Sequence, residues 1–199
     1  MKKLMISFVL FTLFFMVSFA VSDSVLFGEA KVLWDKNKYE DCLNVCGEFL
    51  ESFAVSEFTD DILFLRGKCY YYLWDMENAL KKEEHEFNLS DAVFSFSRLI
   101  DDFPDSDLCP DSLMWIGNCY YFNGEFDNSI NSYKRLTEDY PENPECKNAY
   151  YRIGKCYEGK NDLESALSSY KKVTELFPGT SAAKQAEFDI KRIEKLLEN

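Results

Sequence analysis

The chain has 199 residues, of which 47% are hydrophobic, and this length allows one globular domain with a sizeable core. Its 35 acidic and 22 basic side chains give a net charge of −13 at pH 7. So acidic a surface disfavours binding to nucleic acid and to anionic membranes.

The first 20 residues have the composition of an export signal. Two lysines form a short basic start, residues 4–20 are almost wholly apolar, and Ser18 and Ala20 are small residues at the places that a signal peptidase reads. We therefore expect a signal peptide at 1–20 and an exported, periplasmic protein with no stable membrane insertion after cleavage. The alternative is an uncleaved segment that anchors the remaining domain, 22–199, to the inner membrane.

The pattern of apolar residues after the signal predicts helices rather than strands. A first helix is expected at 22–34 and its partner at 39–53. A long helix follows from 60 to about 82, and Asn88 supplies a capping side chain for the next helix.

The four-residue string Gly-x-Cys-Tyr, in which x is any residue, occurs three times, beginning at Gly67, Gly117 and Gly154. The second and third strings are 37 residues apart, and the same interval separates Pro104, Pro141 and Pro178. Such a period indicates a repeat array. We predict four repeats, the second with 13 inserted residues, and a C-terminal capping helix. Their approximate bounds are 23–56, 60–106, 110–143 and 147–180, with the cap at 181–199.

The fourth unit carries the fullest set of spaced residues: Ile153, Gly154, Tyr157, Ala166, Tyr170, Val173 and Pro178. This pattern resembles the tetratricopeptide repeat (TPR), a helix-turn-helix of about 34 residues. The glycine lets the second helix approach, aromatic side chains fill the space around the contact, and the proline ends the second helix. The resemblance implies an all-α fold, an open right-handed TPR helical solenoid of nine helices.

Two further strings, Phe103-Pro104-Asp105-Ser106 and Tyr140-Pro141-Glu142-Asn143-Pro144, each lead into a helix with the glycine string. In this the chain is similar to bacterial envelope TPR proteins, namely the C-terminal domain of the Tol-Pal-associated coordinator (YbgF type) and the outer-membrane assembly lipoprotein BamD. The resemblance covers roughly residues 60–197. The coiled coil of the former and the lipidated cysteine of the latter have no counterpart here.

Seven cysteines need an explanation in an exported chain. Five of them recur at equivalent repeat positions, which lie roughly 10 Å apart on helix-packing distances, too far for a disulfide. Cys42 and Cys46 share one helix face, the spacing of an incomplete metal site, but no histidine accompanies them. We interpret the cysteines as small buried apolar residues, and we expect no metal and no other cofactor.

Nothing in the sequence predicts an enzyme or a small-molecule substrate. The single histidine, His85, lies in a charge run at 81–86 that we interpret as a solvated helix end or loop. The chain has no nucleophile motif, no glycine-rich phosphate loop and no cysteine–histidine cluster.

The first helix of each repeat lines the concave face in TPR proteins, so that face is the candidate partner-binding site. We count positions so that the repeat glycine is position 8. Position 5 then holds Phe27, Phe64, Met114, Tyr151 and Phe188; position 9 holds Lys31, Lys68, Asn118, Lys155 and Arg192; position 12 adds Trp34, Tyr71 and Tyr121. These positions share one helical face.

Two interpretations of this face stay open. An aromatic row beside a basic row suits an extended partner segment with apolar anchors, and aromatic anchors carry much binding energy. Alternatively, the aromatics pack between repeats and the cations balance carboxylates of the chain, as Lys31 would with Asp35 at i, i+4.

The predicted function is a non-catalytic, exported adaptor that binds protein or peptide partners in the bacterial cell envelope, with the Tol-Pal and cell-wall machinery as the leading partner class. The alternatives are an accessory factor of outer-membrane protein assembly and a membrane-tethered structural scaffold.

Overall fold

The computed structural model describes residues 21–81 and 86–198. Within these ranges the chain forms nine α-helices and no strand, as the repeat pattern predicts. The predicted signal peptide and His85 lie outside the described residues. The helices are α2 (Asp23–Asp35), α3 (Tyr39–Ser52), α4 (Thr59–Ala79), α5 (Leu89–Asp102), α6 (Cys109–Phe122), α7 (Phe126–Asp139), α8 (Cys146–Gly159), α9 (Leu163–Leu176) and α10 (Ser181–Leu197).

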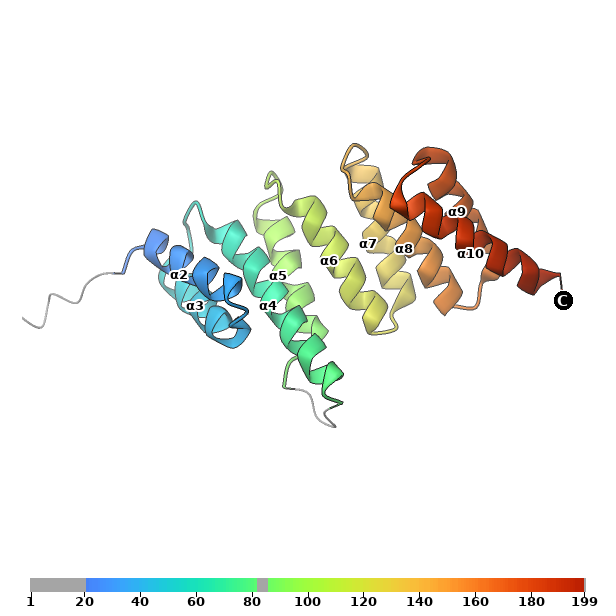
Figure 1. Ribbon diagram of the computed structural model, residues 1–199. Helices are drawn as coiled ribbons and strands as arrows, with labels where there is room; N and C mark the ends of the chain where they lie inside the picture. Colours follow the sequence, from blue (N-terminus) through green and yellow to red (C-terminus); the bar gives the residue numbers. More distant parts are fainter. Residues whose placement is uncertain (1–20, 82–85, 199) are drawn as a thin grey trace, which may run out of the picture.

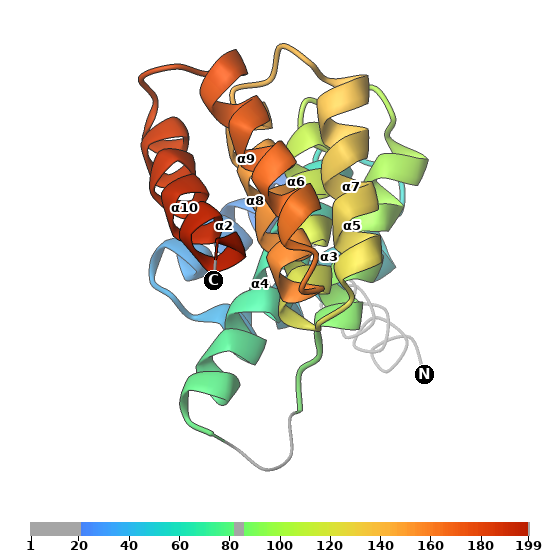
Figure 2. The same cartoon turned by 90° about the vertical axis from the view of Figure 1, so that its right-hand side faces the viewer.

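The helices form an elongated array in chain order, with α2 at one end and α10 at the other (Figure 1). Each helix packs on the one before it and the one after it, while α2 also meets α4 and α8 also meets α10. Viewed from the C-terminal end, α10 covers one flank, and α3, α5 and α7 lie toward the opposite flank (Figure 2). We call the surface presented by α2, α4, α6, α8 and α10 the first-helix face.

A residue with left-handed backbone lies two residues after the end of each of α2, α4, α6 and α8. Gly124 follows α6 and Asn161 follows α8, each seven residues after its repeat glycine, and Asn37 follows α2. Glycine and asparagine suit this conformation, which terminates many helices. In the second repeat the left-handed residue is Lys81, fourteen residues after the repeat glycine.

The insertion in the second repeat therefore lengthens α4. This helix has 21 residues, whereas α6 and α8 have 14 each, so it gains seven residues or about two turns. The remaining six of the 13 inserted residues fall between α4 and α5. In Figure 1 the end of α4 extends below its neighbours.

Prolines end the second helices, as predicted. The helices α5, α7 and α9 end at Asp102, Asp139 and Leu176, and each is followed two residues later by a proline. The residue before a proline is disfavoured in helical conformation, which accounts for the interval. The expected cap of α5 is also present, because Asn88 Oδ1 accepts a hydrogen bond from the backbone N–H of Asp91 (3.1 Å).

The core lies between the two helices of each pair and between successive pairs. Its largest fully buried side chains include Tyr133, Tyr170, Phe49 and Phe96. All seven cysteines are unpaired and buried, in agreement with their interpretation as small core residues. None of the described helices is both long enough and apolar enough to span a membrane.

Candidate functional site

A groove of about 640 Å³ opens on the first-helix face, where α6, α8 and α10 run side by side. Its walls come mainly from repeat positions 2, 5, 6 and 9 of α6 and α8, which share one side of a helix. The lining residues are Asp111, Met114, Trp115, Asn118, Glu145, Asn148, Tyr151, Arg152, Lys155 and Gln185. The repeat therefore places equivalent side chains of two successive helices around one hollow.

Only part of the predicted partner-binding set lines this groove. Met114, Asn118, Tyr151 and Lys155 do. The other predicted residues lie elsewhere on the helices of the first-helix face: Phe27, Lys31, Trp34, Phe64, Lys68 and Tyr71 on α2 and α4, Tyr121 at the end of α6, and Phe188 and Arg192 on α10.

The aromatic residues at position 5 differ in their surroundings: two contact other rings, one forms a hydrogen bond and one is exposed to solvent. Phe27 stacks on Phe58 of the loop before α4, with 4.6 Å between ring centroids, and Phe64 meets the buried ring of Phe96 edge-on at 5.6 Å. Tyr151 donates a hydrogen bond to Asp189 Oδ2 (2.8 Å). Phe188 is 70% exposed. The first three side chains are half-buried and contribute to packing between elements, while Phe188 is free to contact a partner.

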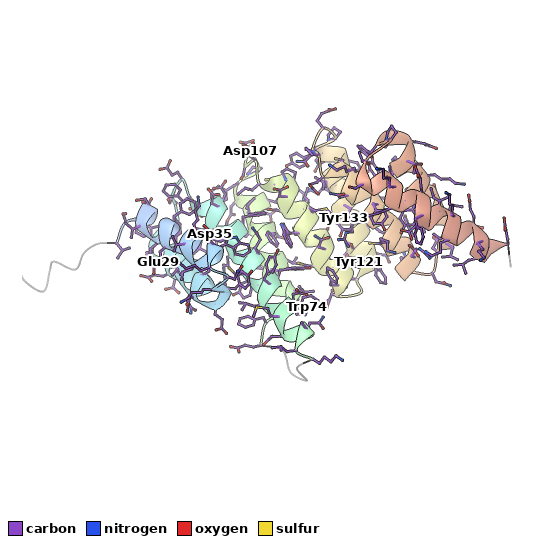
Figure 3. All side chains as sticks on the ribbon, in the orientation of Figure 1. Glu29, Asp35, Trp74, Asp107, Tyr121 and Tyr133 are labelled. Atoms are coloured by element: carbon purple, nitrogen blue, oxygen red, sulfur yellow. The ribbon has the colours of Figure 1, made fainter. Side chains whose placement is uncertain are left out.

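A chain of aromatic contacts occupies the N-terminal part of the first-helix face. Tyr71 meets Trp115 at 5.0 Å between centroids and Phe122 at 6.1 Å, and Tyr72 meets Trp34 at 5.4 Å. Burial raises the pKa of the Tyr71 hydroxyl to about 12. Figure 3 labels two further members of this face, Trp74 and Tyr121. Tyr72 and Phe122 directly follow position 12, so their sequence position was a signal that the three-position pattern missed.

Two of the predicted cations are held by carboxylates of the chain. Lys155 pairs with Glu158 (3.0 Å), and Arg192 pairs with both Glu158 and Asp189. The pair between Arg192 and Glu158 joins the capping helix to α8, while the other two pairs lie within one helix. Burial alone would raise the pKa of Glu158, but the hydrogen bonds from Tyr170, Arg192 and Lys155 outweigh it and hold that pKa below its usual range.

The other residues at position 9 are arranged differently. Lys31 Nζ lies over the ring of Phe27, 5.1 Å from its centroid, and forms no ion pair with Asp35 within the described residues. Lys68 Nζ lies 4.0 Å from the centroid of Trp34, and burial lowers its pKa. Asn118 accepts a hydrogen bond at Oδ1 from the hydroxyl of Tyr133 (2.8 Å), a residue labelled in Figure 3.

Arg152 and Asp111 are groove residues that the sequence pattern missed. Both are half-buried, and neither forms an ion pair or hydrogen bond through its side chain within residues 21–81 and 86–198. Burial, and then repulsion by Glu145, raises the pKa of Asp111. They occupy positions 6 and 2, which recur as Trp115 and Asn148 on the neighbouring helices. The sequence signal was their place on the same helical side as position 9.

The described part of the chain contains no group of three or more histidine, cysteine, aspartate or glutamate side chains suited to hold a metal ion. The groove presents amide, carboxylate, guanidinium and aromatic groups instead. Such groups bind the backbone and side chains of another polypeptide through hydrogen bonds, ion pairs and apolar contacts.

Two stacked layers of antiparallel helices with a polar and aromatic groove on one layer define a helical-repeat scaffold, a class of protein that binds other proteins. The tetratricopeptide repeat profiles match residues 61–106 and 116–180. The chain belongs to the tetratricopeptide repeat family. Among curated proteins, no sequence is significantly similar to it.

Solved structures of TPR proteins have the same fold. A TPR protein from Parabacteroides merdae is 15% identical over 88% of this chain and 61% of its own, with a TM-score of 0.66. YrrB, described as a TPR protein with an unusual peptide-binding site, is 18% identical over 84% of this chain and 75% of its own, with a TM-score of 0.63. MamA is 16% identical over 88% of each chain, with a TM-score of 0.61. The chain thus spans less than two thirds of the Parabacteroides protein, and at these identities the likeness concerns the fold.

Proposed function

We propose that this protein is a non-catalytic adaptor whose groove between α6, α8 and α10 binds a segment of another protein. The observation that carries the proposal is the pair of charged groove residues, Arg152 and Asp111, neither of which forms an ion pair in the described residues. Attraction by Lys68 does not offset the effect of burial and of Glu145 on Asp111, whose pKa stays raised. Half-burying a charge without a partner is unfavourable, so such groups are expected where a ligand supplies the missing contact.

A core residue, Tyr133, also leaves a polar group of this groove available to a ligand. Because Tyr133 donates to Asn118 Oδ1, the amide nitrogen of Asn118 is left to donate a hydrogen bond toward the groove. Trp115 and Met114 add apolar surface beside it. A polypeptide offers both kinds of group, carbonyl oxygens for the amide and side chains for the apolar wall. YrrB, which has the same fold, is described as having a peptide-binding site, and this supports a peptide ligand here.

The proposed location is the bacterial cell envelope. The support is the sequence of residues 1–20, with its basic start, apolar run and small residues at 18 and 20. In the envelope the leading partner class is the Tol-Pal and cell-wall machinery. An accessory role in outer-membrane protein assembly and a tethered scaffold with an uncleaved leader are the competing proposals.

Affinity capture with matched variants tests the adaptor proposal. The bait is the wild-type protein beside Trp115→Ala and Arg152→Glu, which alter the groove. Arg135→Glu is the control, because Arg135 lies on α7 and its one ion pair within the described residues is with the nearby Asp139 at an exposed site. A partner retained by wild type and control but lost from both groove variants supports the proposal. A partner retained equally by all four places the interface elsewhere and contradicts it.

Intact mass spectrometry tests the location. A purified chain that begins at Val21 supports export and rules out the tether. A full-length chain in the membrane fraction contradicts cleavage and favours the tethered scaffold. The identity of the captured partner then separates the cell-wall machinery from outer-membrane assembly.

A further inference from the structure

We propose that the partner segment is an extended stretch of polypeptide with a basic side chain between two acidic ones. The two acidic side chains pair with Lys68 and Arg152, and the basic one pairs with Asp111. This inference rests on the proposed function, since it names the chemistry of the bound segment. Asp111 and Arg152 line the groove, and the segment extends beyond it to Lys68 on α4.

Lys68 is the first of the three charges along the array. Its ammonium lies between two rings, 4.0 Å from the centroid of Trp34 and 5.5 Å from that of Phe64. The rings offer cation–π attraction but no negative charge. Burial lowers its pKa, and the attraction of Asp111, which forms no ion pair with Lys68 within 4 Å, does not offset that effect. A carboxylate from a partner would restore the missing interaction.

Asp111 is the second charge and lies on the next first helix, α6. It belongs to the first helical turn, where a carboxylate interacts favourably with the helix dipole. Its pKa is nevertheless raised, by burial and then by Glu145, so the dipole does not compensate for the lost solvent. A lysine or arginine of the partner would be attracted to both carboxylates.

Arg152 is the third charge and lies on α8. It has no ion pair in the described residues, although Lys155, three residues later on the same helix, pairs with Glu158. A guanidinium presents a planar set of donors that fits a carboxylate through two hydrogen bonds. An acidic side chain of the partner therefore fits Arg152 better than any neutral group.

The alternation of sign follows from what the rest of the face has already neutralised. Lys155 and Arg192 are paired with Glu158 and Asp189, and Glu145 accepts a hydrogen bond from Asn148 (2.7 Å). The half-buried charged side chains of the first helices that form neither an ion pair nor a side-chain hydrogen bond in the described residues are Lys68, Asp111 and Arg152. They lie on three successive first helices, α4, α6 and α8, in the order positive, negative, positive. A ligand of the opposite alternation is complementary in either chain direction.

The spacing of the ligand charges follows from helix packing. Neighbouring helices of one layer are separated by roughly 10 Å. Lys68 is at position 9 and Asp111 at position 2, so the path between successive charges is diagonal. An extended chain advances about 3.3 Å per residue, which places the ligand charges about three to five residues apart. The amide nitrogen of Asn118 and the amide oxygen of Asn148 remain to bind the backbone between them.

Fluorescence anisotropy with labelled synthetic peptides tests the inference on the full-length protein. One peptide carries glutamate, lysine and glutamate at four-residue intervals in a glycine–serine–proline background. A second carries lysine, glutamate and lysine at the same places. We expect the first to bind at least about tenfold more tightly, because reversing charges against desolvated partners costs affinity at each site.

A charge exchange identifies the register. Arg152→Glu should lose the glutamate–lysine–glutamate peptide and recover binding when one terminal glutamate of that peptide is replaced by lysine, while Arg135→Glu should behave as wild type. Equal binding of the two original peptides to wild-type protein would overturn the inference without any variant having to fold. If the peptides fail but Trp115→Ala still loses a captured partner, the charge alternation is wrong and the adaptor proposal stands. If the peptides fail to bind and Trp115→Ala also retains every captured partner, both the charge alternation and the adaptor proposal are wrong.

Discussion

The ring of Tyr133 occupies the place in which a side chain at Gly117 would have to lie. A Cβ built on Gly117 would overlap the edge of that ring, and the same relation holds between Gly154 and Tyr170 and between Gly67 and Phe96. In the first repeat the glycine is replaced by Ala30, and the matching residue on the second helix is the smaller Cys46, both fully buried. The closeness of each helix pair is therefore set by one small residue and the size of the residue opposite.

Gly117→Ala should destabilise the protein although alanine favours helix. The added methyl group must displace a fully buried tyrosine ring, and overpacking of this kind costs about 1–3 kcal/mol. Thermal and urea unfolding followed by circular dichroism measure the change. Gly28→Ala is the matched control, because nothing lies within 4 Å of its Cβ position, and it should stabilise the protein by about 0.5–1 kcal/mol. A neutral Gly117→Ala would mean that Tyr133 moves freely in the core.

The helices and their core were predictable because the same local sequence pattern recurs in successive repeats. The interval between glycine and proline, the capping side chain of Asn88 and the terminal helix at 181–197 all agree with the structure. Whether a cation on the first-helix face meets a carboxylate was not predictable in this way. Lys155 and Arg192 are neutralised by Glu158, which is at position 12, where the three preceding repeats carry aromatic residues. That single departure from the pattern gives two predicted binding residues an intramolecular partner, Lys155 within α8 and Arg192 between α10 and α8.

Glu158 should make the stability of the protein depend on acid pH. Its pKa is held below the usual 4.5 in the folded state, so the folded protein favours the carboxylate more than the unfolded chain does. This contribution is fully present above about pH 4.5 and is lost as the pH falls through the lower folded pKa. Urea unfolding between pH 7 and pH 3 measures it.

Glu158→Gln should lower stability at pH 7 by about 1–3 kcal/mol, because the charged hydrogen bonds to Arg192 and Lys155 are weakened, and should flatten the acid-side loss. Glu138→Gln serves as the control, since Glu138 is exposed on α7 and forms no ion pair in the described residues. If both variants lose stability with acid as steeply as wild type, Glu158 is not the group responsible.

Cys119 and Cys156 should resist alkylation until the protein unfolds. Cys119 and Cys156 are fully buried, and burial raises their thiol pKa to about 12 and about 11. The thiolate is the form that reacts with iodoacetamide, and it is scarce at pH 8 when the pKa is that high. Mass spectrometry should find these residues unmodified in native protein and modified in urea. Val55→Cys, at a position that is 98% exposed, is the positive control. Rapid native labelling of Cys119 would mean that α6 separates from its neighbours on the labelling timescale.

Tyr133→Phe should separate the packing role of the ring from the role of its hydroxyl. The ring still fills the space beside Gly117, and the substitution removes the hydrogen bond to Asn118 Oδ1 (2.8 Å). The loss should lower the free energy of unfolding by about 0.5–1.5 kcal/mol, the usual net contribution of such a bond.

Tyr133→Phe should also weaken partner binding, because the Asn118 amide is then free to rotate away from the orientation that presents its nitrogen to the groove. Tyr120→Phe is the control on the neighbouring helix, since the Tyr120 hydroxyl forms no hydrogen bond within the described residues. Unfolding in urea and affinity capture, measured on both variants, distinguish the outcomes: a stability loss with unchanged capture would show that Asn118 supports the fold and does not contact the partner.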